Sequence, residues 1–459
     1  MTKSFVLKKF KVDKLRLNAD KNQLIEDGKK CAKETPIDEI TQYHSVKRDA
    51  VEMIKTQEAT LIPELLSLRH QRMMENAFTF LRGTAGIMEY DILHGSKESH
   101  IPVMICGDAH LNNFGFFASP ERQLLFGLND FDETRVGSWE NDLKRLMVSA
   151  KLISEINGYD AEDTRKILEK TAKSYEDGIE YANNLNLLDR HYLSYNIKDL
   201  LEIAKDDEQM IKVLNKIAKK APHQNSDKVV KKFTEEKDGK IQFKENPPRA
   251  RRMSQKSYDK ILEAFEQYLK NLSPDMQVFL SNFKVTDIIR YSVGVGSFGT
   301  RCYLILLKGK DDTNLVLQIK EALPSKYDLL KLTVEEAEKQ SFEEGKRVIT
   351  GQKILQTFFD PFLGYTKTKE RNYYVRQFRD MKDSIDSTKL DKESFAAYAR
   401  LCSFILAVAH YQSPTAPMIY GYLKESKKFS KKMADWAETY SKQVHEDYDA
   451  FAKYLRGEE

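Results

Sequence analysis

Three side chains suited to metal binding and proton transfer follow two short apolar runs in the first third of the chain. Asp108 comes just after the run Pro102–Cys106, Asn113 lies five residues further on, and Asp130 comes just after the run Leu124–Leu128. Short apolar runs closed by polar residues predict buried strands. A carboxylate can accept the proton of an attacking hydroxyl, and carboxylate and amide oxygens are the hard ligands that Mg²⁺ prefers. We therefore expect Asp108 to be a catalytic base, and Asn113 and Asp130 to be metal ligands.

Two more residues of this stretch carry suitable groups, and each admits two interpretations. His110 could orient or relay the proton of an acceptor hydroxyl, or it could hydrogen-bond the backbone of its own loop. Asp132 could support the metal ligands from behind, or it could be a solvated surface carboxylate. The whole stretch could also be a polar turn between two strands, with Asp108 as a cap. We take His110 as a second catalytic candidate and Asp132 as a third metal candidate.

A glycine motif and a lysine in the second half of the chain have the chemistry to bind phosphates. Gly294, Gly296 and Gly299 form the pattern G-x-G-x-x-G, and two β-rich runs follow, the second ending at Lys320. A dinucleotide-binding turn should open a helix instead, which disfavours a Rossmann oxidoreductase. Glycines allow the backbone to approach phosphates closely, and a lysine adds a point charge. The alternative is a glycine-rich hairpin beside an exposed lysine. We expect these residues, with Ser297 in the same loop, to bind ATP.

The two motifs together match the parts of a protein kinase in reversed order. An Asp with an Asn five residues later, then a strand and a second Asp before an aromatic residue, is the order of kinase catalytic and metal loops. A glycine hairpin followed by a lysine on the third strand is the order of the kinase nucleotide lobe. Here the hairpin follows Asp108 by nearly two hundred residues. A circular permutation would explain the reversal. The predicted fold class is therefore α/β (α+β), with a two-lobed, circularly permuted, kinase-like architecture.

This assignment divides the chain into four segments. Residues 1–45 would form an N-terminal arm, and 46–282 a large helical lobe that carries the catalytic and metal loops. Residues 283–380 would form a small β-rich lobe that binds the nucleotide, and 381–459 would be C-terminal helices that complete the large lobe. Gln377 would begin the hinge between the lobes, where backbone groups read the adenine.

Several charged residues have a role that the sequence leaves open. The lysine of a kinase nucleotide lobe needs an acidic partner, and Glu343 and Glu344 are candidates, with Gln352 as a neutral substitute. Arg82 could contact a phosphate in a bidentate manner, or it could pair with a carboxylate at the edge of the core.

A helix is predicted at residues 139–157 from the spacing of its apolar residues. Asp142, near its start, is suited to a buried role in which it holds backbone N–H groups of a loop, although a helix N-terminus favours a carboxylate in any case. Lys144 and Arg145 of the same helix could face the nucleotide or be solvated.

The stretch around Asp108 resembles the catalytic loop of the aminoglycoside phosphotransferases, which reads H-G-D-x-H-x-x-N. The matching residues are Gly107, Asp108, His110 and Asn113. Cys106 stands where those enzymes have the first histidine. The resemblance implies that Asp130 is a metal ligand and that Asp142 braces the catalytic loop.

The chain also resembles a bacterial family known as domain of unknown function 2252, over roughly residues 60–410. The segments that carry this resemblance are Phe80–Gly83, Gly107–Gly115, Asp130–Glu133, Asp142–Leu146, Gly294–Arg301 and Gln318–Ala322. The resemblance implies a kinase-like fold and names no substrate.

Composition narrows the class of protein further. The 74 basic and 70 acidic residues balance to a net charge of +4, which argues against a nucleic-acid partner. No apolar run approaches the roughly 18 residues of a membrane span, and the basic N-terminus lacks the apolar core of a secretory signal. Four scattered cysteines fit a reducing compartment. We expect a cytoplasmic protein, with its oligomeric state left open.

The function that these patterns favour is transfer of a phosphoryl group from ATP, with Mg²⁺, to the hydroxyl of a small molecule. Two alternatives use the same residues. Some kinase-like proteins transfer AMP instead of phosphate, and a non-catalytic pseudokinase could bind the nucleotide as a switch or scaffold.

Overall fold

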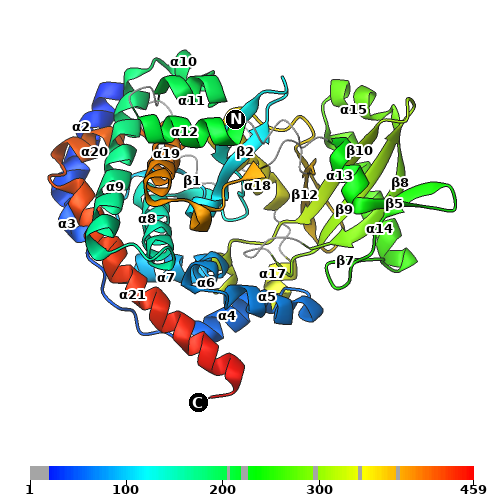
Figure 1. The fold of residues 1–459 in the computed structure, drawn as a ribbon, viewed down its shortest axis with the longest axis horizontal. Helices are drawn as coiled ribbons and strands as arrows, with labels where there is room; N and C mark the ends of the chain where they lie inside the picture. The colour runs from blue at the N-terminus through cyan, green and yellow to red at the C-terminus, as the bar shows by residue number, and fades with distance from the viewer. Residues whose placement is uncertain are drawn as a thin grey trace.

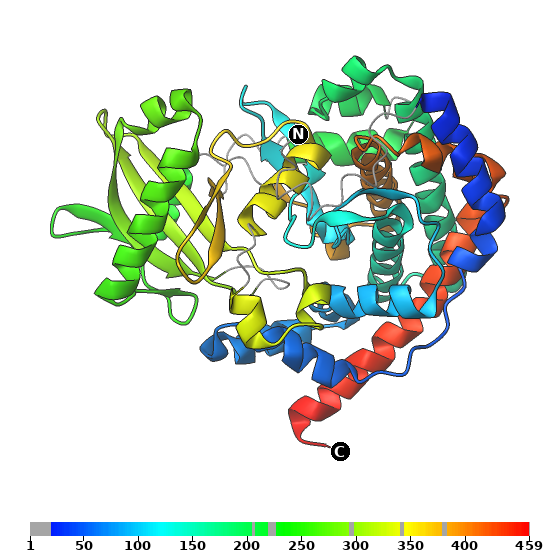
Figure 2. The same cartoon turned by 180° about the vertical axis from the view of Figure 1, so that it is seen from behind.

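The chain folds into a helical part and a part built on an antiparallel sheet, in a computed structural model that describes residues 20–203, 207–218, 226–292, 298–339, 344–378 and 383–458. Figure 1 shows the helical part at the left and the sheet at the right, and Figure 2 shows the same division from behind. The mixed α/β class expected from the sequence is confirmed.

The large sheet has six strands in the order β11-β12-β10-β9-β8-β7, with every neighbouring pair antiparallel. Successive side chains of β9 point to opposite faces, so that Leu304 and Leu306 enter one core while Ile305 and Leu307 enter another. This explains why the strand reads as a continuous apolar run. The strands are β7 (Ala250–Arg251), β8 (Phe283–Tyr291), β9 (Cys302–Gly309), β10 (Asn314–Glu321), β11 (Gly364–Lys367) and β12 (Asn372–Gln377).

Both faces of this sheet are covered by the segment that precedes β8. Helix α14 (Gln255–Asn271) packs on one face through Ile261, Phe265 and Tyr268. On the other face, Val230 of α13 (Ser226–Phe233) and Phe243 share a core with the sheet. The predicted boundary at residue 282 is therefore wrong, because residues from 226 onward belong with the sheet. The remaining elements of this segment are the hairpin strands β5 (Thr234–Lys237) and β6 (Lys240–Phe243), and helix α15 (Pro274–Leu280).

The helical part has one large core that also takes in two small sheets. Helices α8, α9, α19 and α21 pack against one another, and α2 packs on α20 so closely that a Cβ on Gly28 would lie 1.9 Å from the Met418 carbonyl oxygen. The helices before β1 are α2 (Lys21–Glu34), α3 (Ile37–Ile40), α4 (Ala50–Glu58), α5 (Leu66–Met73), α6 (Ala77–Gly83) and α7 (Ala85–Gly95). Those after β4 are α8 (Trp139–Ile156), α9 (Ala161–Asn184), α10 (Leu187–His191), α11 (Ile197–Ile203), α12 (Glu208–Ala218), α19 (Lys392–His410), α20 (Pro417–Glu425) and α21 (Phe429–Arg456).

The strands of the two small sheets border the loops that carry Asp108, Asn113 and Asp130. Strand β1 (Pro102–Ile105) pairs with β4 (Arg135–Ser138), and β2 (Phe114–Ala118) lies between β13 (Asp383–Ser384) and β3 (Leu124–Leu128). Strands β1 and β3 confirm the two predicted strands. Strand β2 was not predicted.

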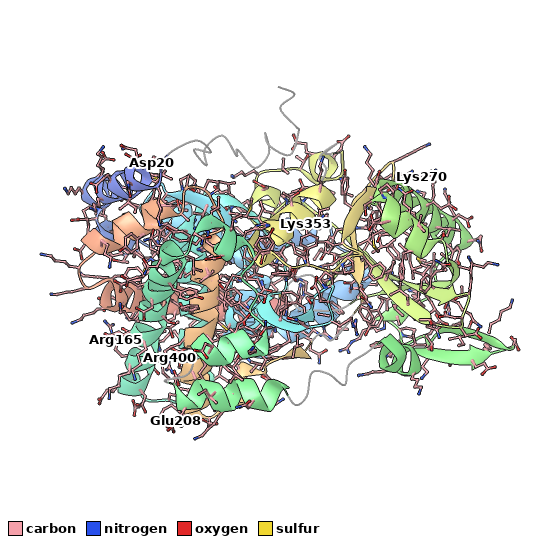
Figure 3. All side chains as sticks on the ribbon, turned by 90° about the horizontal axis from the view of Figure 1, so that it is seen from above. Asp20, Arg165, Glu208, Lys270, Lys353 and Arg400 are labelled. Atoms are coloured by element: carbon pink, nitrogen blue, oxygen red, sulfur yellow. The ribbon has the colours of Figure 1, made fainter. Side chains whose placement is uncertain are left out.

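Helix α18 (Glu344–Gln356) lies between the two parts, where Figure 3 labels its Lys353. A Cβ on Gly345 would lie 2.2 Å from the Tyr373 carbonyl oxygen, and a Cβ on Gly351 would lie 2.3 Å from the Thr134 side chain. Glycine at these two positions thus allows the helix to contact the large sheet and the segment before β4 together. Two shorter helices precede it along the chain, α16 (Lys326–Leu329) and α17 (Val334–Lys339).

Lys144 of α8 lies inside the helical core, so neither interpretation of this residue from the sequence is right. Its Nζ is buried without a hydrogen-bond partner among the described residues, 5.0 Å from the centroid of the Trp436 ring. Burial lowers the pKa of Lys144 to about 8, although Glu140 and Glu98 oppose the shift. The protein therefore holds a buried cation that costs stability at neutral pH.

The variant Lys144→Met should be more stable than the wild type at pH 7. An unfolded lysine has a pKa of about 10.4, so between that pH and about 8 the unfolded state binds a proton that the folded state does not. Wild-type stability is consequently lost as the pH falls through this window. The variant should gain at most about 3 kcal/mol in free energy of unfolding at pH 7, measured by urea denaturation, and the gain should vanish toward pH 10.4.

The control is Lys151→Met on the same helix, where the lysine pairs with Glu155 near the surface. This change should shift stability by less than about 0.5 kcal/mol. Equal urea midpoints at pH 7 for Lys144→Met and the wild type would show that the buried Lys144 cation does not cost stability.

Candidate active site

One buried carboxylate, that of Asp142, holds the backbone at the start of the loop after β1. Asp142 accepts hydrogen bonds from the backbone N–H of Cys106 at 2.7 Å and of Gly107 at 2.8 Å. His410, at the end of α19, contacts the same carboxylate at 3.1 Å and Tyr175 at 2.7 Å. The bracing role predicted for Asp142 is confirmed, and His410 has the structural role of holding that carboxylate.

Gly107 brings this loop against the loop after β3. Its φ of +79° lies in the left-handed region, where glycine is strongly favoured, and a Cβ would lie 2.4 Å from the Glu133 carbonyl oxygen. The Cys106 thiol reaches across the same junction to the Asp130 carbonyl oxygen at 3.1 Å. The two loops that carry the candidate catalytic and metal residues are thus packed directly on each other.

Asp108 is paired with an arginine that the sequence left unassigned. Arg145 of α8 is buried and contacts one oxygen, Oδ1, through Nε at 2.9 Å and through Nη2 at 2.8 Å. Burial alone would raise the pKa of Asp108, but the charges of Arg145 and Lys326 outweigh it and hold the pKa below its usual value. Asp108 is therefore ionised at neutral pH. Both interpretations of Arg145 are replaced by this role.

His110 lies beside Asp108 and is electrically neutral. Its Nε2 is 3.9 Å from Asp108 Oδ2, and its Nδ1 is buried without a hydrogen-bond partner among the described residues. Burial, helped by Arg82 and Arg145, lowers the pKa of His110 to about 3. Among the described residues, the His110 side chain has no hydrogen bond to the backbone, which was one interpretation of this residue.

Asn113 is oriented by the backbone of both loops. Its Nδ2 donates to the carbonyl oxygens of Asp108 at 2.9 Å and Asp130 at 3.0 Å. The amide nitrogen is thereby occupied, which leaves Oδ1 as the atom that could bind a cation. The Asp130 side chain is 45% exposed, so its carboxylate is accessible to a ligand.

Lys320 of β10 comes from the large sheet into the same site. Its side chain is 95% buried, and its ammonium group forms an ion pair with Asp132 and lies 3.9 Å from Asp130 Oδ2. Burial alone would lower the pKa of Lys320, but these two carboxylates hold it well above its usual value. The Tyr374 hydroxyl donates to the other oxygen of Asp132 at 3.0 Å. Asp132 is thus the partner of Lys320, and not a solvated surface residue.

The predicted helix partners of Lys320 have other contacts. Glu344 forms an ion pair with Arg347 at 2.6 Å, and Gln352 hydrogen-bonds Gln356. Glu343 lies outside the described residues. Arg347 donates to the backbone carbonyl of Asp132 at 2.7 Å, so α18 contributes to this site through an arginine and not through an acid.

Of the predicted glycine hairpin, only the C-terminal end lies within the described residues. Gly294, Gly296 and Ser297 lie outside the described residues. Gly299 has a φ of +106° and its carbonyl oxygen accepts from the backbone N–H of Ile62 at 2.9 Å. The next residue, Thr300, lines the same pocket as Asp108.

Gln377 is not brought to that pocket. It ends β12, and its backbone N–H hydrogen-bonds the Asp360 carboxylate. The next backbone N–H, that of Phe378, donates to the Val316 carbonyl oxygen at 2.9 Å. The rest of the predicted hinge, residues 379–380, lies outside the described residues.

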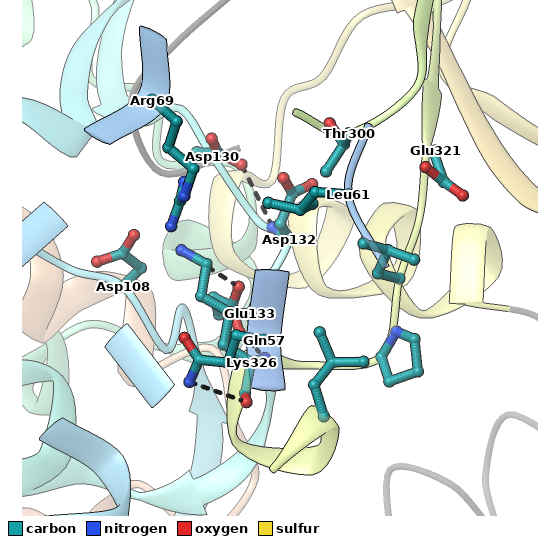
Figure 4. A pocket seen from close by; sticks show the side chains of 13 residues that line it. Gln57, Leu61, Arg69, Asp108, Asp130, Asp132, Glu133, Thr300, Glu321 and Lys326 are labelled. Atoms are coloured by element: carbon teal, nitrogen blue, oxygen red, sulfur yellow. Dashed lines mark hydrogen bonds and ion pairs between the residues drawn. The ribbon is translucent and has the colours of Figure 1, made fainter. Parts of the chain in front are cut away.

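A pocket between the two parts is lined by three of the predicted site residues, Asp108, Asp130 and Asp132. Figure 4 shows Arg69 pointing toward the space between Asp108 and Asp130, with Asp132 and Lys326 also at the wall. The remaining lining residues are Gln57, Leu61, Glu133, Thr300, Glu321, Leu323, Pro324 and Leu329. They come from helices before β1, from both loops and from the end of the large sheet.

The acidic groups alone do not form a closed metal cage. Among the described residues, no group of three or more His, Cys, Asp or Glu side chains is arranged to hold a metal ion. Mg²⁺ in nucleotide sites is bound through one or two carboxylates together with substrate phosphates. The accessible Asp130 carboxylate and the oriented Asn113 amide fit that kind of site.

Comparison with known proteins places the chain in a family. It belongs to the family described as "uncharacterized protein conserved in bacteria (DUF2252)", whose model matches residues 61–454. No curated protein and no solved structure matches the chain. Within the described ranges, no helix has both the length and the apolar character that a membrane crossing requires.

Replacing the bracing carboxylate should destabilise the fold. In Asp142→Asn one oxygen becomes an NH₂ group that faces a backbone donor, so at least one buried N–H loses its acceptor. We expect the free energy of unfolding, measured by urea denaturation, to fall by about 2–4 kcal/mol.

The matched control is Asp160→Asn at the start of α9, where the side chain caps the helix in solvent. Asparagine caps about as well as aspartate there, so the change should be small. A loss below about 0.5 kcal/mol for Asp142→Asn would show that the brace is not needed.

Proposed function

We propose that the protein is a phosphotransferase of kinase-like, circularly permuted fold that transfers a phosphoryl group from ATP, with Mg²⁺, to the hydroxyl of a small molecule. The observation that carries the proposal is the ion pair between Lys320 and Asp132, which joins a strand of the large sheet to a loop 188 residues earlier. The pair brings the lysine next to Asp130, and Asp130 shares its loop junction with Asp108 and Asn113.

The surroundings of Lys320 support the same assignment. Lys320 lies on the third strand counted from the one that enters the glycine hairpin, which is where protein kinases carry their phosphate-binding lysine. Helix α18 follows along the chain after the short helices α16 and α17, and β12 beyond it pairs with the lysine strand. Two features depart from the protein-kinase and phosphotransferase patterns. Asp132 stands in for a helix glutamate as the partner of the lysine, and a thiol replaces the first histidine of the phosphotransferase loop.

The residues around Asp108 are arranged for proton transfer from an acceptor. Arg145 occupies Oδ1, so Oδ2 remains to accept a hydrogen bond from the hydroxyl of the acceptor. The carboxylate is ionised, as that role requires. In phosphoryl transfer most of the catalysis comes from positioning and charge, and the bracing by Asp142 supplies the positioning.

Asn113 Oδ1 and the Asp130 carboxylate are the groups that would hold Mg²⁺. When bound, the ion would neutralise charge on the nucleotide phosphates. Lys320, already charged and buried, would share its ammonium group between Asp132 and those phosphates.

Loss of the base should abolish turnover without loss of nucleotide binding. For Asp108→Asn we expect turnover to fall by about 10²–10⁴-fold, while the dissociation constant for ATP with Mg²⁺ changes by less than about threefold. The assay follows ADP release and, by mass spectrometry, the products; phosphate on an acceptor or AMP on an acceptor separates the two kinds of transfer. Asp435→Asn on α21, in a surface ion pair, is the control. Wild-type turnover in Asp108→Asn would refute its role.

The two acids of the metal loop should behave differently. Asp130→Asn should weaken ATP binding about tenfold in the presence of Mg²⁺ and leave binding in EDTA unchanged, because only the metal contact is lost. Asp132→Asn should alter both affinities alike, since it releases Lys320. Calorimetric titration of each variant with and without Mg²⁺ distinguishes them. An unchanged Mg²⁺ dependence in Asp130→Asn would argue against a metal site there.

A further inference from the structure

Arg82 occupies the last turn of α6, which is held by two arginines of the pocket. The carbonyl oxygen of Leu81 accepts from Arg145 Nη2 at 2.6 Å, and that of Gly83 accepts from Arg69 Nη2 at 3.1 Å. Arg145 is the partner of Asp108, and Arg69 lines the pocket. Arg82 is therefore fixed beside the candidate reaction centre by contacts on both sides.

Among the described residues, Arg82 has no carboxylate in an ion pair with it, unlike Arg69 and Arg145. Arg69 pairs with Glu58 at 2.8 Å, and Arg145 pairs with Asp108 as described above. Within the described ranges, Arg82 forms no ion pair, and its Nε is buried without a hydrogen-bond partner. Its guanidinium lies 5.9 Å from the centroid of the Phe78 ring. One of the two interpretations from the sequence, pairing with a carboxylate at the core edge, is thus wrong.

A second unpartnered nitrogen lies at the same place. The His110 ring meets the same Phe78 ring edge to face, with centroids 5.9 Å apart, and its Nδ1 is buried without a partner. Buried polar groups are almost always hydrogen-bonded, so each exception calls for an explanation. The two unpartnered nitrogens both lie beside the Phe78 ring and near Asp108. A ligand that supplied hydrogen-bond acceptors to both nitrogens would explain both exceptions.

The charge and hydrogen-bonding groups of Arg82 and His110 indicate the chemical class of that ligand. An arginine stays protonated in proteins, and a partly buried guanidinium without a counter-ion is unfavourable. The planar guanidinium binds carboxylate or phosphate oxygens in a bidentate manner, and a neutral imidazole can donate one further hydrogen bond.

We infer that Arg82 and His110 form an oxyanion site beside Asp108, which binds a carboxylate or phosphate group of a ligand. The inference rests on the proposed function in one respect, which is where the oxyanion comes from. Either the hydroxyl-bearing acceptor carries an anionic group of its own, or the oxyanion is the terminal phosphate of the nucleotide.

The test is a calorimetric titration of the full chain with inorganic phosphate, for the wild type, Arg82→Gln and Arg82→Lys. We expect the wild type to bind phosphate and Arg82→Gln to bind it about tenfold more weakly or worse. Arg82→Lys should fall between them, because it keeps the charge and loses the bidentate geometry. Arg165→Gln, in a surface ion-pair network on α9, is the control and should bind as the wild type does.

Repeating the titration in two nucleotide complexes separates the sources. Phosphate binding that persists with Mg²⁺ and β,γ-imido-ATP assigns the site to the acceptor, because the terminal phosphate position is then filled. Binding that persists with ADP but is lost with β,γ-imido-ATP assigns it to the nucleotide.

Two results would overturn the inference: no binding of phosphate by the wild type in any of these states, or equal affinity in the wild type and Arg82→Gln. Failure of the proposed function has a different signature. In that case neither nucleotide binds, while phosphate binding to the nucleotide-free protein still depends on Arg82.

Discussion

The buried ammonium group of Lys320 joins the large sheet to the loop after β3. Removing a lysine from water costs several kcal/mol unless opposite charges replace the lost hydration. Asp132 and Asp130 supply those charges from the loop after β3, and Tyr374 holds the second oxygen of Asp132. Tyr374 is the residue directly opposite Lys320 in the neighbouring strand. The register of the sheet and the position of the loop are therefore coupled through one charge.

The second constraint acts on the other loop, from the helical core. Asp142 holds the backbone at Cys106 and Gly107, and Gly107 allows that backbone to lie directly on the segment after β3. The Cys106 thiol then reaches the Asp130 carbonyl oxygen. A histidine at this position could donate a stronger bond, since a thiol is a weak donor. The contact between the loops is nevertheless kept, so the departure from the phosphotransferase pattern at Cys106 does not separate the loop after β1 from the loop after β3.

Local patterns in the sequence were enough to predict the elements and some of the site. The apolar runs before Gly107 and Asn129 are strands, and the helix that carries Asp142 begins at Trp139. The bracing role of Asp142 could be predicted from the resemblance to the aminoglycoside phosphotransferases, although its contacts with Cys106 and Gly107 span 36 and 35 residues of chain. The pairing of Lys320 with Asp132 and of Asp108 with Arg145 could not, because a charge pair formed by tertiary packing has no signature in sequence spacing. Strand β2 was missed since Phe114–Ala118 contains a glycine and no alternation.

Asp108 and Lys320 have opposite surroundings in neighbouring parts of the site. Lys320 is a cation among acids, whereas Asp108 is an acid among the guanidinium groups of Arg145 and, further off, Arg82. A site with positive and negative groups a short distance apart orients a polar ligand more strictly than a single charge does. A ligand bound in the reversed orientation would bring like charges together. For the proposed reaction this means that the nucleotide phosphates belong at Lys320 and the acceptor at Asp108. If the oxyanion belongs to the acceptor, Arg82 and His110 would hold that anionic group while the acceptor hydroxyl meets Asp108.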